Sequence, residues 1–163
     1  MILRQTFKAH FISLSYTIVT TVLLLAGWWY FDFDRDYAIV AGIFHSIFTI
    51  PALYLHIEYT VRNFGEEIEI TDSRIIVRKN GDERRFNSDE LAMAIVYKSA
   101  SIDRNGIPLT AMECYYFIRI LAKNGEEIIV TSLMSRKADT AIRRLTMMPT
   151  ERIKSFFCTL RWK

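Results

Sequence analysis

Two long stretches near the start of the chain contain no charged residue. They cover residues 11–31 (FISLSYTIVTTVLLLAGWWYF) and residues 37–57 (YAIVAGIFHSIFTIPALYLHI). Each is about 20 residues long, and a helix of that length spans the roughly 30 Å of hydrocarbon in a bilayer. Backbone groups find no water in that layer, so they must be paired within the segment, as they are in a helix. The pattern predicts two transmembrane helices joined by a short turn at residues 32–36.

A cleaved signal peptide is the alternative for the first stretch, with Arg4 and Lys8 as its basic region. However, the stretch is longer than the roughly 7–15 apolar residues of a signal peptide, and no small-x-small cleavage motif precedes soluble sequence. Trp28, Trp29 and Tyr30 close the stretch instead, as in the aromatic belt at a membrane surface. We therefore expect an uncleaved anchor.

Charges at the ends of the two stretches predict their orientation. Arg4 and Lys8 precede the first stretch, Arg62 follows the second, and the turn between them (DFDRD) is net acidic. The positive-inside rule places residues 1–10 and the chain after the second helix in the cytoplasm, and the turn at residues 32–36 outside. We expect an integral inner-membrane protein with two spans and both termini cytoplasmic.

Small and polar residues recur along both stretches at steps of three and four, which place them on one helix face. They are Ser13, Thr17, Thr20, Leu24 and Gly27 in the first stretch, and Ala38, Gly42, His45, Thr49, Ala52 and His56 in the second. Such stripes let membrane helices approach closely. We expect the two stripes to pack within one hairpin, and the alternative is that the second also forms a homo-oligomer. A packing role is expected for the two histidines, with a proton, ion or ligand role as the alternative.

After residue 57 the apolar positions take a period of two, which is typical of strands. Strands are predicted at residues 67–71, 74–79, 83–87, 93–99, 115–122 and 126–132, with a short irregular one near 109–112. Asn80-Gly81 and Asn124-Gly125 predict tight hairpins. Ser135 is expected to begin a helix with Ala138, Ala141, Ile142 and Leu145 facing inward. The fold class is therefore α+β, with the helical hairpin followed by an antiparallel barrel or sandwich that the helix caps.

The order of these segments resembles that of bacterial PH-like domains. The resemblance rests on EIEITDSRIIVRKNGDERRF, YFIRIL, NGEEIIVTSL and the basic helix that follows, and it covers residues 60–147. Many such domains follow a pair of membrane helices. The resemblance implies a partly open seven-stranded barrel with a C-terminal helical cap over residues 58–148, and binding or scaffolding without catalysis. It does not carry phosphoinositide binding to this chain, because Arg78, Lys79, Arg84 and Arg85 alternate with acidic residues.

Residues 149–163 form a basic, amphipathic pattern that predicts a second helix. We expect this region to contact anionic lipid head groups or a protein partner, and the alternative is a helix docked on the domain. The expected contact residues are Arg143, Arg144, Arg152, Lys154, Phe156, Phe157, Arg161 and Trp162.

Composition excludes several functions. The net charge of +3 is modest and no nucleic-acid motif is present. Cys114 and Cys158 provide no disulfide framework, and no histidine follows residue 57. Without a nucleophile motif, a phosphate loop or metal-ligand spacing, we expect no enzyme, cofactor or metal. The predicted function is a membrane-anchored binding or scaffolding module that recruits a protein or contacts lipid. The alternative is a small oligomeric membrane effector or channel-like protein, gated by a ligand or partner on the β-domain.

Overall fold

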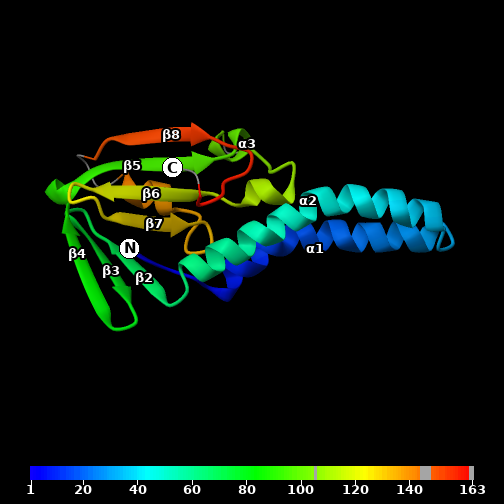
Figure 1. The fold of residues 1–163 in the computed structure, drawn as a ribbon, viewed down its shortest axis with the longest axis horizontal. Coiled ribbons are helices and arrows are strands. Elements are labelled where there is room, and N and C mark those ends of the chain that lie inside the picture. The colour runs from blue at the N-terminus through cyan, green and yellow to red at the C-terminus, as the bar shows by residue number, and fades with distance from the viewer. Residues whose placement is uncertain (105, 144–147, 162–163) are drawn as a thin grey trace.

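The computed structural model describes residues 1–104, 106–143 and 148–161. A pair of long antiparallel helices extends from one end of a body built of two sheets (Figure 1). The chain passes from the first short strand through both helices and only then builds the rest of the sheets. The α+β class predicted from the sequence is confirmed.

The two helices are α1 (Phe7–Tyr30) and α2 (Arg35–Arg62). Both are long and apolar enough to cross a membrane, and only 11% of the most apolar stretch of each is buried. α1 begins at residue 7 rather than 11, because the Thr6 side chain accepts the N–H of Ala9 and caps the helix there. α2 continues through Pro51 and ends at residue 62 rather than 57. The predicted stretches were bounded by the nearest charged residues. The helices instead begin and end at their capping residues.

The strands form two four-stranded sheets with a common core. The first sheet contains, in spatial order, β1 (Ile2–Arg4), β2 (Glu66–Ile70), β3 (Arg74–Lys79) and β4 (Asp82–Asn87); the second contains β7 (Glu127–Thr131), β6 (Phe117–Ala122), β5 (Leu91–Lys98) and β8 (Thr150–Lys154). All neighbours are antiparallel except β5 and β8. Ile68 and Ile75 of the first sheet meet Ile118 and Ile120 of the second in one fully buried cluster. The described strands thus form a sandwich and not a closed barrel.

The short helix α4 (Ala138–Ile142) covers this core, and Ala138, Ala141 and Ile142 are buried as predicted. Leu145, the fourth predicted inward residue, lies outside the described residues. The irregular strand predicted near residues 109–112 is wrong. Ala111–Cys114 forms a short 3₁₀ helix, η2, which follows the one-turn helix α3 (Ala100–Asp103) and a loop.

Strand β1 was not predicted, since residues 1–10 were expected to lie outside the domain. It pairs with β2 so that Leu3 lies opposite Ile68, and Leu3 is fully buried. Three residues are too few to show a period of two. The N-terminal segment is therefore part of the first sheet.

The helix predicted for residues 149–163 is wrong. Thr150–Lys154 forms β8, which runs parallel to β5 with Arg152 opposite Val96. Pairing with the open edge of β5 provides hydrogen-bond partners for the backbone N–H and C=O groups of this segment, so a helix is not required to pair them. The apolar spacing that resembled a helix has another cause, because Ile153, Phe157 and Leu160 pack one after another against a second apolar cluster.

Candidate functional site at the helix–sheet junction

The last part of α2 is built into the sheet body. Ala52, Leu55 and Tyr59 are fully buried in the second apolar cluster. The ring of Tyr59 lies nearly perpendicular to those of Tyr115 and Phe117, with centroids 5.7 and 6.3 Å away, and its hydroxyl donates to the carbonyl of Cys158. We call this region the junction. It joins the helices and the sheets into one packed unit.

Two polar residues of α2 and its cap complete the junction. The buried amide of Asn63 donates to the carboxylate of Glu66 in β2 and, at 2.9 Å, to the carbonyl of Ile129 in β7. The Glu58 carboxylate accepts the hydroxyl of Thr159 at 3.0 Å and the N–H of Leu160 at 3.1 Å. One helix end is thus tied to both sheets and to the C-terminal segment.

Ala52 was predicted as part of the stripe of α2. Leu55 was left out of that stripe, and Tyr59 lies beyond residue 57, where the predicted stretch ended. A signal for them existed, since Ala52, Leu55 and Tyr59 continue the steps of three and four expected of a helix face. Asn63 carried no comparable signal, because its partners Glu66 and Ile129 become neighbours only in the folded chain.

The two histidines of α2, His45 and His56, are hydrogen-bonded within the protein. His45 of α2 lies 3.0 Å from the hydroxyl of Thr21 in α1 and 3.0 Å from that of Thr49. His56 lies 3.1 Å from His10 of α1 and 3.1 Å from the Tyr115 hydroxyl. Both imidazoles therefore link α2 to neighbouring elements, which is the geometry of packing residues.

The residues of the predicted stripe of α2 do not all lie on the same side of the helix. A Cβ added to Gly27 of α1 would overlap the phenol of Tyr37, so the helices meet closely there. A Cβ added to Gly42 would have no atom within 4 Å. Ala38 and Gly42 instead line a shallow outward groove together with Ser46. The stripe divides into an inner part at His45–His56 and an outer part at Ala38 and Gly42.

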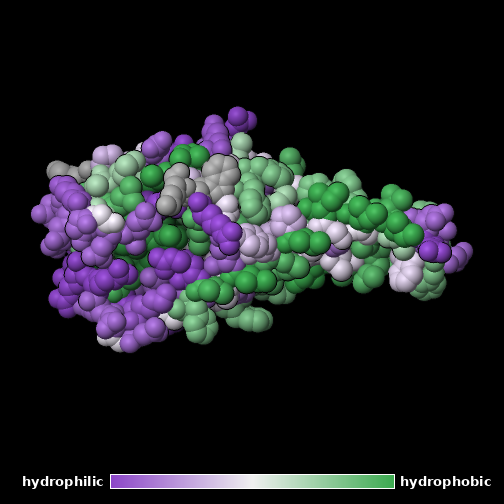
Figure 2. All heavy atoms as spheres, viewed as in Figure 1, coloured by the Kyte–Doolittle hydropathy of each residue, from purple (hydrophilic) through white to green (hydrophobic). Residues whose placement is uncertain are grey.

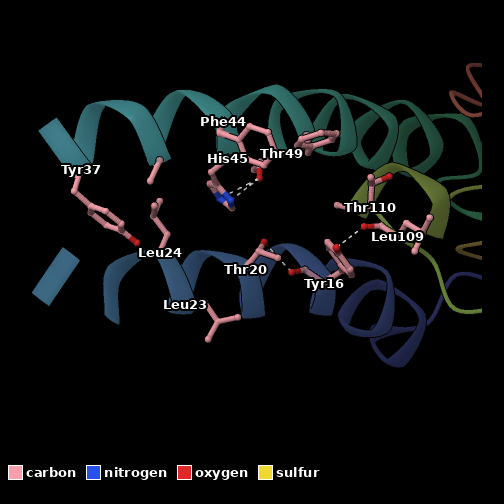
Figure 3. A pocket seen from close by; sticks show the side chains of 13 residues that line it. Tyr16, Thr20, Leu23, Leu24, Tyr37, Phe44, His45, Thr49, Leu109 and Thr110 are labelled. Atoms are coloured by element: carbon pink, nitrogen blue, oxygen red, sulfur yellow. Dashed lines mark hydrogen bonds between the residues drawn. The ribbon is translucent and has the colours of Figure 1, made fainter. Parts of the chain in front are cut away.

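A second, less open groove of about 460 Å³ lies between the two helices. Figure 3 shows Tyr37 at one end and Leu109 and Thr110 of the sheet body at the other, with His45 and Thr49 of α2 facing Thr20 and Tyr16 of α1. Most of the lining is apolar or aromatic, and the polar groups are hydroxyls and one imidazole. Such a groove suits an apolar chain or side chain rather than an ion.

Over the residues that the structure describes, no group of three or more His, Cys, Asp and Glu side chains could hold a metal ion. Both cysteines are free and buried. Burial raises the pKa of the Cys114 thiol and raises that of Cys158 to about 12. Both thiols therefore stay protonated at neutral pH and are poor nucleophiles.

Three arginines of the first sheet, Arg78, Arg84 and Arg85, are paired with carboxylates. Arg78 contacts Glu67, Glu69 and Glu83 at 3.2, 2.9 and 2.8 Å. Hydrogen bonds from Arg78 and then Arg85 hold the pKa of Glu83 below its usual value. This solvated network leaves Arg78 little capacity for a phosphate.

The C-terminal contact residues predicted from the sequence are divided between two places. Arg152, on β8, donates to Asp103 at 2.9 Å, and Lys154 is exposed on the same strand. Phe157 stacks on Tyr54 of α2, with centroids 6.2 Å apart, while Phe156 is exposed. Arg143, after α4, and Arg161 are exposed, and Arg144 and Trp162 lie outside the described residues.

The chain matches a known protein family. A family model described as a PH domain matches residues 2–141, and no curated protein matches the chain. The matched range begins in β1, includes both long helices and extends into α4. The helices are therefore inside the matched architecture rather than an addition to it.

Proposed function

The chain belongs to the PH domain family, and from that premise we propose that it is a membrane-anchored binding module. PH-like domains are typically non-catalytic binding modules that bind proteins or lipids. In this proposal, α1 and α2 cross the inner membrane and hold the sheet body at its cytoplasmic surface. There the body recruits a protein partner or contacts lipid. The observation that carries the proposal is α2, which runs unbroken from an exposed apolar section into the core of the junction.

The surface of the helices supports the membrane part of the proposal. Figure 2 shows hydrophobic residues along the helical hairpin and hydrophilic residues over the sheets and at the tip of the hairpin. Val40, Ile43, Phe44 and Ile47 are among the exposed side chains of α2. A continuous apolar surface of this size is unfavourable in water and favourable in hydrocarbon.

The pairing of β1 with β2 supports the proposal that both ends of the helical hairpin lie on the same side of the membrane. β1 precedes α1 and β2 follows α2, yet the two strands are hydrogen-bonded neighbours. With the hairpin across the membrane, residues 2–4 and 66–70 must then lie on one side. The basic flanks Arg4, Lys8 and Arg62 favour the cytoplasmic side.

The exposed cations of the C-terminal segment support contact with lipid head groups. Lys154 and Arg161 are exposed, and the segment between them returns to α2 at Tyr54, near the inner end of the apolar section. Each cation near an anionic leaflet contributes about 1 kcal/mol. Because the body is already held at the membrane, weak contacts of this kind are sufficient.

We expect single cysteines at opposite ends of the molecule to be labelled from opposite sides of the membrane. Arg35→Cys at the hairpin tip should react with a membrane-impermeant maleimide in intact spheroplasts, and Lys123→Cys, after β6, only in inverted vesicles. The native thiols serve as the internal control, since their burial should keep both unlabelled. Labelling of both sites from the same side would overturn the two-span anchor.

The outward groove at Ala38, Gly42 and Ser46 favours a second candidate function, a homo-oligomeric membrane effector. Small residues on an apolar helix permit close helix contact. Under this candidate, a second copy would occupy the groove, and the sheet body would gate the assembly on binding a ligand or partner.

A matched pair of glycine variants tests the hairpin and the oligomer together. Gly27→Leu should lower the free energy of unfolding by about 1–3 kcal/mol, because the added side chain displaces Tyr37. Gly42→Leu should change the free energy of unfolding by less than about 0.5 kcal/mol, because the space there is open.

Native mass spectrometry of gently extracted Gly42→Leu then decides the second candidate. Loss of a homo-oligomer seen for the unmodified protein supports it, and an identical mass distribution rejects it.

A further inference from the structure

The loop between α3 and η2 carries two of the most exposed apolar side chains outside the long helices. Ile107 is 84% and Leu109 is 74% exposed. Single exposed hydrophobic residues are ordinary on soluble proteins. These two flank Pro108, and in Figure 1 the α3 region lies at the end of the sheet body that faces the helices. We call residues 106–110 the insertion loop.

The insertion loop lies against the helices rather than above them. The Tyr16 hydroxyl of α1 donates to the carbonyl of Leu109, and Leu109 lines the groove between the two helices together with Phe48 and Thr49 of α2 (Figure 3). η2, which directly follows the loop, packs on both helices. The loop is therefore fixed at the level of Tyr16.

The level of Tyr16 is inside the apolar section of α1. Tyr16 comes five residues after Phe11, where the uncharged stretch begins. At about 1.5 Å per residue, this places it about 7 Å beyond the start of that stretch. Segments that bind at a membrane interface bury their apolar side chains to about 5–10 Å.

The backbone around Leu109 is suited to an apolar medium, where an unpaired peptide group costs several kcal/mol. Pro108 has no N–H to satisfy. The N–H groups of Leu109 and Thr110 both donate to the carboxylate of Glu113, which is buried and also accepts the hydroxyl of Ser101 at 3.1 Å. The Leu109 carbonyl accepts the hydroxyl of Tyr16. The side chains of Ile107 and Leu109 are therefore exposed, while the backbone N–H groups of Leu109 and Thr110 and the carbonyl of Leu109 are hydrogen-bonded within the protein.

Polar groups mark the base of the loop. Arg104 is exposed just before it, and Asp103 pairs with Arg152 at 2.9 Å. A charged base behind an apolar tip is the arrangement expected where head groups meet acyl chains.

We propose that the insertion loop places Ile107 and Leu109 among the acyl chains of the inner leaflet. The proposal rests on the membrane-anchored function above, and it adds a third point of membrane contact beside α1 and α2. α1 and α2 fix the distance of the sheet body from the bilayer. The contact made by the insertion loop, to one side of these helices, fixes the angle between the sheet body and the bilayer surface. The face of the body that meets a partner is thereby set.

The test places an environment-sensitive nitrobenzoxadiazole label on single cysteines of the full chain in phosphatidylglycerol–phosphatidylcholine vesicles. Ile107→Cys and Leu109→Cys are labelled separately, so that each variant keeps one of the two apolar tips. Val40→Cys on the exposed face of α2 reports the anchor, and Lys123→Cys reports water. We expect the loop labels to show blue-shifted emission and to lose fluorescence to lipids with a nitroxide near the head-group end of the acyl chain. The Val40 label, three residues inside the outer end of the second uncharged stretch, should be quenched by the same shallow nitroxides, and the Lys123 label should not be quenched.

The outcomes separate the two proposals. A quenched Val40 label together with loop labels that behave like the Lys123 label would overturn insertion and leave the anchor standing. Failure of lipid nitroxides to quench any of the four labels would overturn both. Quenching of the Val40 label and of both loop labels supports both.

Discussion

Replacing Tyr59 with alanine should lower the free energy of unfolding by about 3–5 kcal/mol, the range for truncating a large aromatic side chain in a core. Tyr59 has no exposed surface, and it fills the space between α2, Tyr115 and Phe117. The substitution also removes the hydroxyl that donates to the Cys158 carbonyl. Thermal or chemical unfolding in detergent micelles, followed by circular dichroism of the sheet signal, measures the change.

Two further variants separate the contributions at Tyr59. Tyr59→Phe keeps the ring and loses only the hydrogen bond, so a loss of about 1 kcal/mol is expected. Tyr30→Ala, at the exposed far end of α1, should have an effect within about 0.5 kcal/mol. A Tyr59→Ala protein with the stability of Tyr30→Ala would contradict the docking of α2 into the sheet body.

The second large effect is expected at Asn63. Asn63→Leu keeps the approximate size of the side chain but removes both donors, one to the Glu66 carboxylate and one to the Ile129 carbonyl. Glu66 is buried, and Arg62, at 3.4 Å, would be left as its charged partner. A buried carboxylate that loses a hydrogen-bond donor is strongly destabilised, so we expect a loss of about 3 kcal/mol in the same unfolding assay.

A double-mutant cycle identifies the cause of the Asn63 effect. In a Glu66→Gln background the buried charge is absent, so Asn63→Leu should cost clearly less than it does with Glu66 in place. Equal costs in the two backgrounds would show that the Glu66 charge plays no part. The loss would then belong to the Ile129 carbonyl and to local packing.

Local patterns predicted much of the fold. The two uncharged stretches became the two long helices, and most predicted strands formed within a few residues of their expected bounds. Asn80-Gly81 forms the predicted hairpin turn, with φ angles of 52° and 91°. These features depend on solvent, on residue period or on the backbone freedom of two adjacent residues, all of which are visible in a short window of sequence.

Features that depend on distant partners were not predictable. β8 is a strand because β5 offers an open edge, and the sequence of residues 150–154 does not reveal that edge. The hydrogen bond from Tyr59 to Cys158 joins residues 99 positions apart. The end of the insertion loop was predicted as the start of a short irregular strand, and only the contact of Leu109 with Tyr16 places the loop beside the helices.

Pairing between β1 and β2 has a consequence for biosynthesis. Residues 2–4 are translated first, whereas their partners at residues 67–69 leave the ribosome only after both helices. At about 5–20 residues per second, β1 waits for several seconds without a partner. Under the proposed topology, a nascent chain that inserts one helix instead of two leaves β1 and β2 on opposite sides of the membrane. Its sheet then keeps an open edge, which marks the chain for aggregation or proteolysis. Under the proposed topology, closure of the first sheet would therefore distinguish chains with two inserted helices from chains with one.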